Sequence, residues 1–141
     1  MSGRESAKYI ITELKPKVEA PWTPVFKPEE ISTVLFLDNS VIKGAFYVET
    51  AWFWPQLAKN GTRGQPHQHD YDEVLAFFGS DPKNPHDLGA ELEFQINGEN
   101  HIINKSCLIF IPKGMQHGPP IFNKIDRPLF HFACGTGKDY F

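Results

Sequence analysis

Histidine and glutamate residues gather in one short stretch of the chain, GTRGQPHQHDYDEVLAFFG at residues 61–79. His67 and His69 are two residues apart, so on an extended chain both imidazoles project to the same side. Glu73 follows His69 by four residues, an even number, and its carboxylate reaches the same point if the chain stays extended or turns tightly. A third imidazole, His117, follows the turn in IFIPKGMQHGPP. Three neutral imidazoles and one carboxylate suit zinc, iron, manganese, cobalt or nickel.

Spacing alone leaves ordinary explanations open. Two histidines at alternate positions also occur on the solvated face of a strand, and a single glutamate is more often a surface charge. The pattern therefore has to be weighed together with the elements that position these side chains.

The sequence around these residues predicts strands rather than helices. The segments rich in β-branched and aromatic residues are STVLFLD, KGAFYVETAWFWP, EVLAFFG, ELEFQI, HIINKS, SCLIFIP and PLFHFAC. The Asn97-Gly98 pair between two of them is a strong hairpin signal. We find no convincing amphipathic helix of about ten residues or more. Many short strands separated by turns indicate an all-β sandwich or barrel.

The N-terminal part has a different composition. Residues 8–14, KYIITEL, predict a first strand, whereas residues 15–28 contain four prolines, which block helix interiors and central strands. We interpret this stretch as an extended arm anchored by Trp22 and Phe26. Residues 1–30 are thus expected to form a strand and a proline-rich arm packed on a barrel of residues 31–141.

Composition limits the classes of function. The chain has 141 residues, 40% of them hydrophobic, and a formal charge of −3, which fits one folded domain and argues against nucleic acid as a partner. Its apolar runs are too short to span a bilayer, and its N-terminus lacks the apolar region of a signal peptide. We expect a cytoplasmic protein.

Two motifs in sequence order resemble those of the cupin superfamily. The first reads Gly61, five residues, His67-Gln68-His69, three residues and Glu73, with Gly79 one residue earlier than the family has it. The second reads Ser106, where the family has glycine, then five residues, Pro112-Lys113-Gly114, two residues and His117. Ile121 stands where the family has its final asparagine. The four ligand positions remain intact, and the resemblance covers about residues 40–135.

The resemblance implies an all-β fold, the double-stranded β-helix or jelly-roll barrel of the cupins, here with an extended N-terminal arm. It also implies one divalent transition metal ion (Fe, Mn, Zn, Ni or Co) near an open end of the barrel, held by His67, His69, Glu73 and His117. Small cupins commonly pair through their sheets, so a homodimer is expected.

Strand parity suggests which residues bind a small molecule beside this metal. Phe77 shares the parity of Glu73 and is expected to line the barrel interior. Trp52, Trp54 and His131 are further candidates for the pocket wall, although packing in the core or on a sheet is the commoner role for such tryptophans, and a core or exposed position is the commoner one for such a histidine. Glu93 and Gln95 alternate with apolar neighbours in ELEFQI, and the sequence leaves open which face is inside.

We therefore predict a metal-dependent enzyme that acts on a small polar organic molecule, of dioxygenase, isomerase or lyase type. The alternative is a non-catalytic module that binds or senses a small ligand through its metal, and a structural protein with a vestigial site is a third possibility. Neither nucleic acid nor a membrane is an expected partner, and the sequence assigns no catalytic residue.

Overall fold

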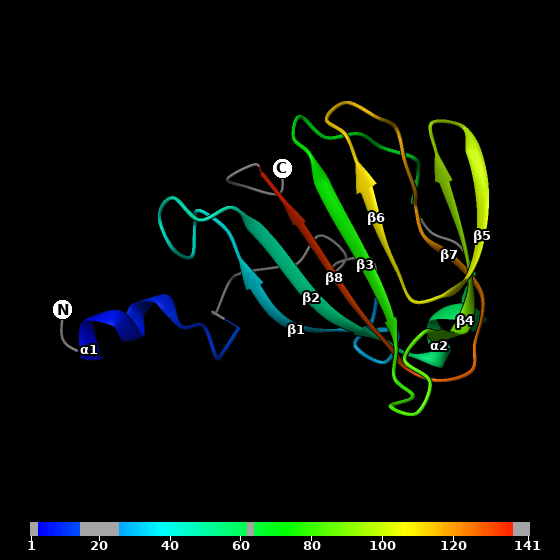
Figure 1. The fold of residues 1–141 in the computed structure, drawn as a ribbon, viewed down its shortest axis with the longest axis horizontal. Coiled ribbons are helices and arrows are strands. Elements are labelled where there is room, and N and C mark those ends of the chain that lie inside the picture. Colours follow the sequence, from blue (N-terminus) through cyan, green and yellow to red (C-terminus); the bar gives the residue numbers. More distant parts are fainter. Residues whose placement is uncertain (1–2, 15–25, 62–63, 137–141) are drawn as a thin grey trace.

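The computed structural model describes residues 3–14, 26–61 and 64–136, which form two antiparallel β-sheets (Figure 1). The larger sheet has the strand order β1-β2-β8-β3-β6, and the smaller sheet has the order β5-β4-β7. The strands are β1 (Ile31–Leu37), β2 (Tyr47–Phe53), β3 (Glu73–Gly79), β4 (Asp87–Ile96), β5 (Glu99–Lys105), β6 (Cys107–Ile111), β7 (Ile121–Ile125) and β8 (Leu129–Gly135). Each predicted strand from residue 32 onward has a counterpart among them.

The core lies between the two sheets. Along β2 and β8 every second residue is buried, beginning at Tyr47 and Leu129, so one face of each strand points inward. From the smaller sheet Phe94 is buried, whereas the Glu93 carboxylate accepts a hydrogen bond from Asn123 on the exposed side. The face of ELEFQI that the sequence left open is thus decided, with Phe94 inside.

The predicted hairpin joins β4 and β5. Asn97 and Gly98 have φ angles of 50° and 84°, which place both residues in the left-handed region. Two successive residues of this kind form the type I′ turn, whose twist matches that of the flanking strands. The pairing of Ile96 with Glu99 follows directly from this two-residue loop.

Two elements after residue 30 have no counterpart in the prediction. Helix α2 (Pro55–Lys59) is a short turn with proline at its start, too short to give a periodic pattern. Strand β7 contains Asn123 and Lys124 between apolar residues, so its composition is ambiguous. It becomes a strand because β4 supplies its hydrogen-bonding partner.

The predicted strand at residues 8–14 is wrong. Residues Gly3–Ser6 form a short α-helix, α1, and Ala7–Tyr9 continue it as a 3₁₀ helix, η1, while residues 10–14 carry no regular structure. A strand requires a neighbouring strand for its hydrogen bonds, and in Figure 1 this segment lies beyond β1 and β2, away from the sheets. Ile10 is accordingly 67% exposed. Residues 15–25 of the predicted arm (15–28), with Trp22, lie outside the described residues.

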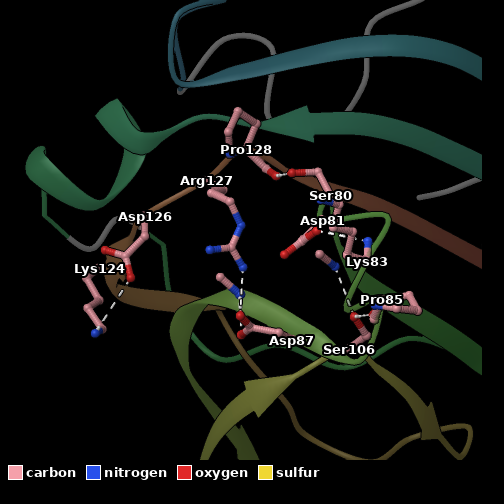
Figure 2. Close-up of polar contacts among 12 residues, drawn as sticks. Ser80, Asp81, Lys83, Pro85, Asp87, Ser106, Lys124, Asp126, Arg127 and Pro128 are labelled. Carbon is pink, nitrogen blue, oxygen red and sulfur yellow. Dashed lines mark hydrogen bonds and ion pairs between the residues drawn. The ribbon is translucent and has the colours of Figure 1, made fainter.

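Polar contacts close the end of the barrel where β3 ends and β6 begins (Figure 2). Arg127 donates to Asp87 across 2.7 Å. Ser106, which replaces the motif glycine, accepts a hydrogen bond from the Gly79 N–H and donates one to the Pro85 carbonyl, at 3.0 and 2.6 Å. The serine therefore ties together the ends of two strands instead of disturbing the loop.

The described part of the chain has no helix long and apolar enough to cross a membrane. The homodimer and the cytoplasmic location stay predictions.

Candidate metal centre

The histidines of the two motifs meet at the other end of β3, where a loop and a strand end come together. The backbone N–H of His67 donates to the His117 carbonyl at 3.0 Å, and the His117 N–H donates to the His67 carbonyl at 2.9 Å. This reciprocal bridge joins the segment before β3 to the segment after β6. Residues distant in sequence are therefore held together by main-chain hydrogen bonds before any side chain contributes.

Three imidazoles form one cluster. One ring nitrogen from each of His67, His69 and His117 lies within 4.8 Å of the others. His117 is buried and His67 is the most exposed of the three. The ring of Tyr71 stacks on His69 with centroids 4.8 Å apart and an angle of 13° between the planes, which fixes the orientation of that imidazole.

The Glu73 carboxylate faces the same cluster. Its Oε1 atom lies 3.2 Å from Nε2 of His117 and 3.7 Å from Nε2 of His69. Glu73 is the first residue of β3 and only 3% exposed, so the strand fixes its backbone while burial restricts its side chain. The structure thus brings together all four residues that the two motifs supply.

The tautomer of His117 indicates a need for a cation. Its Nδ1 atom is 3.0 Å from the Met115 carbonyl oxygen, which can only accept, so Nδ1 carries the hydrogen. In a neutral ring Nε2 then presents a lone pair to the Glu73 oxygen, and two acceptors at this distance repel each other. A proton or a metal ion between them removes the repulsion. A histidine held through its second nitrogen is also the usual arrangement of a metal-binding imidazole.

Electrostatics favour neutral rings at two of the positions. Burial lowers the pKa of His67, and the nearby His117 adds to this effect. Burial likewise lowers the pKa of His69, although the Glu73 carboxylate opposes it. For His117 burial works in the same direction, but the Glu73 carboxylate and the Met115 carbonyl outweigh it and raise the pKa. A metal ion would therefore compete with a proton mainly at His117.

The residues present fit a transition metal. Imidazole nitrogen suits zinc, iron, cobalt and nickel, and a carboxylate completes a mixed nitrogen and oxygen donor set. The cluster of His67, His69 and His117 could hold a metal ion on these grounds.

A cavity of about 350 Å³ opens beside the cluster, between the two sheets. Its walls include His67, Glu73 and His117, and elsewhere they are largely apolar, with Leu75 and Phe94 from opposite sheets. A mostly apolar cavity with a few converging polar groups is typical of a small-molecule site.

The four residues predicted to bind substrate lie in different places. His131 lines the cavity and is 3% exposed. Phe77 is fully buried beside His131, with ring centroids 4.6 Å apart and the ring planes tilted by 34°, and it is not among the described residues that line the cavity. Trp52 lies on the outer face of β2 and stacks on Trp54, which directly follows this strand and donates to Ser32. Strand alternation is the reason, because Phe53 between them takes the inward position.

Sequence reasoning missed Glu49, which also lines the cavity and is 4% exposed. A signal was present, because Glu49 shares the parity of Tyr47 and Phe53 in YVETAWF and is thus the charged residue on an apolar strand face. A buried carboxylate on such a face requires a partner or a function.

Comparison with solved structures identifies the fold, although no protein-family model and no curated protein matches the sequence. An oxalate oxidase in complex with the substrate analogue glycolate is similar over 99% of this chain and 65% of its own, with a TM-score of 0.56 and 15% identity. A recombinant oxalate oxidase in complex with glycolate is similar over 94% of this chain and 61% of its own, with a TM-score of 0.55 and 15% identity. An RmlC-like cupin from Shewanella frigidimarina NCIMB 400 is similar over 90% of this chain and 96% of its own, with a TM-score of 0.50 and 11% identity.

The chain therefore has the cupin fold, and the predicted all-β jelly-roll barrel is confirmed. It spans less than two thirds of the length of the two oxalate oxidases. At these identities the similarity defines the fold and leaves the chemistry to be argued from the site.

Proposed function

We propose that this chain is a metal-dependent enzyme that acts on a small polar organic molecule. One divalent transition metal ion would be held by His67, His69, Glu73 and His117. The observation that carries the proposal is the cavity, because three of these four side chains form part of its wall. When bound, the ion would supply Lewis-acid polarisation of an oxygen atom placed in that cavity.

The chain's own residues have defined tasks in this proposal. The Met115 carbonyl holds the proton of His117 at Nδ1, which leaves Nε2 available as a ligand. Tyr71 orients His69 by stacking. Apolar residues such as Leu75 and Phe94 line the rest of the cavity, and a molecule that displaces water there would have stronger polar interactions with the site.

Metal stoichiometry tests the first part of the proposal. Purified protein is loaded with one metal at a time, and bound metal is measured by elemental analysis and calorimetry. About one ion per chain is expected, with much weaker binding in His67→Ala and His117→Ala. His101→Ala is the matched control, since His101 is exposed on β5 and is not one of the clustered histidines. Parent-like metal affinity in both cluster variants would contradict the assigned site.

Access of small ligands separates an enzyme from a structural metal. Azide and glycolate are titrated into the cobalt-loaded protein, and the visible spectrum reports any change at the metal. Nitric oxide added to the iron-loaded protein tests the branch of oxygen chemistry. A site closed to all three probes would reject the enzyme. Access without turnover of diketones, hydroxy acids and sugar derivatives would favour the alternative, a metal-dependent ligand-binding module.

A further inference from the structure

Glu49 and His131 form a second polar pair inside the cavity. They lie on the adjacent strands β2 and β8, at inward positions, and are 4% and 3% exposed. The His131 Nε2 atom is 3.5 Å from Oε1 of Glu49. Both residues line the same cavity as His67, Glu73 and His117. The cavity therefore has two polar regions, and the candidate metal centre accounts for only one.

The hydrogen-bond geometry requires one proton between these two side chains. His131 Nδ1 is 2.9 Å from the Ala76 carbonyl oxygen, which can only accept, so Nδ1 carries a hydrogen. A neutral ring then turns the lone pair of Nε2 toward Glu49. A carboxylate facing that lone pair would be repelled, so one more proton is held, either by the carboxyl group or by Nε2. The pair can thus both accept and return a proton.

The surroundings also act on the protonation of Glu49. Burial raises the pKa of the Glu49 carboxyl, whereas His131 and the Tyr47 hydroxyl stabilise its charged form and Glu73 opposes it. Opposing influences of this kind bring a carboxyl group closer to the range in which a general acid or base operates.

The arrangement of the sheet sets the size of the ligand. Strand β8 lies between β2 and β3, so the backbones that carry Glu49 and Glu73 are about 10 Å apart at the usual strand spacing. At about 30 Å³ for each water, the 350 Å³ cavity holds about a dozen water molecules. Apolar side chains, among them Leu75, Phe53 and Phe122, line the cavity as well. A molecule of a few carbon atoms with polar groups at both ends matches this shape.

We propose that Glu49 and His131 are a catalytic proton-transfer pair, and that the substrate is a small carbonyl compound with an acidic C–H bond and a hydroxyl or carboxylate group. The inference rests on the proposed function, because the substrate's oxygen is taken to lie at the metal centre.

In the step itself, the Glu49 carboxylate removes the proton from the carbon beside the carbonyl group while His131 holds its own proton. The electron pair of that C–H bond forms a carbon–carbon double bond, and the carbonyl π electrons move to oxygen. The reverse step returns a proton to carbon. No oxidant or reductant is needed.

Deuterium exchange measures this step without a known substrate. Zinc-loaded protein is incubated in D₂O with hydroxyacetone or pyruvate, and proton NMR follows the loss of the C–H signals. Glu49→Gln is expected to slow the protein-dependent exchange by about 100-fold, the usual scale for a general base. Azide affinity of the cobalt-loaded variant should stay that of the parent. Glu93→Gln, which removes a carboxylate from the exposed side of β4, is the control and should exchange normally.

A second readout needs no metal. Long-range proton–nitrogen NMR of the metal-free protein reports the tautomer of His131, and a hydrogen on Nδ1 is expected in the parent. A neutral ring with its hydrogen on Nε2 would overturn the one-proton arrangement. If Glu49→Gln does not fold, Glu49→Asp retains the carboxyl group while withdrawing it by one methylene, and slower exchange is again expected.

The possible failures are distinguishable. Normal exchange in the folded Glu49 variants, or no exchange of either probe by a parent that binds azide, would reject the proton-transfer pair and leave the proposed function standing. A parent that binds neither metal nor azide would reject both.

Discussion

Zinc loading is expected to raise the melting temperature of the chain. The ligand-bearing segments are far apart in sequence and meet only through the backbone bridge between His67 and His117. An ion that requires all four side chains therefore binds the folded state and not the unfolded chain. Such binding stabilises the fold by mass action.

The size of the effect follows from the ligand concentration and the chain length. At free zinc about 100 times the dissociation constant, the gain is about 2.7 kcal/mol. For a chain of 141 residues, 1 kcal/mol corresponds to about 2 to 4 °C. We therefore expect an increase of about 5 to 11 °C over the metal-free protein.

The increase should depend on pH in a defined direction. The pKa values of His67 and His69 are lowered from 6.5, so these rings remain neutral as pH falls toward that value. The pKa of His117 is raised from 6.5, so a proton competes with zinc first at this ring. The increase should be full near pH 8, shrink as pH falls through 6.5, and be small at pH 5.

Calorimetry or fluorescence melts with and without a chelator measure this quantity at each pH. His117→Ala should lose the increase, and His101→Ala should retain it. A melting temperature that ignores the chelator, with metal shown to leave, would refute the reasoning and indicate a barrel that needs no ion.

Three further substitutions test other parts of the structure. The pKa of Glu49 is raised above 4.5, so ionisation of this buried carboxyl group destabilises the fold as pH rises above 4.5. The melting temperature of Glu49→Gln minus that of the parent should therefore increase from pH 4.5 to pH 8. A difference that does not change with pH would contradict this. A Cβ at Gly79 would lie 1.8 Å from the Asp87 carbonyl oxygen, so Gly79→Ala should cost about 1–3 kcal/mol in urea unfolding; unchanged stability would exclude this close packing. Glu30 is 1% exposed and accepts hydrogen bonds from the Lys27 N–H and the Asn60 amide. Glu30→Ala should therefore lower the free energy of unfolding by about 1–3 kcal/mol. A urea midpoint equal to that of the parent would refute the burial argument.

Local composition let the sequence determine most of the strands. β-branched and aromatic residues are frequent in YVETAWF and EVLAFFG, and each segment coincides with a strand. The turn between β4 and β5 could be predicted because Asn97 and Gly98 tolerate the backbone angles that a two-residue hairpin requires. The motif spacing likewise indicated which residues to examine for a metal site, since His67 and His69 project together on any extended chain.

The tertiary structure alone decided which faces are inside and which distant residues outside the two motifs meet. Alternation divides β2 into two faces, but only packing against the other sheet places Phe53 inward and Trp52 outward. The pairing of Glu49 with His131 depends on the register of β2 against β8, and register is set by long-range hydrogen bonds. A strand before residue 15 failed to form for the same reason, because β-structure requires a partner that local sequence does not supply.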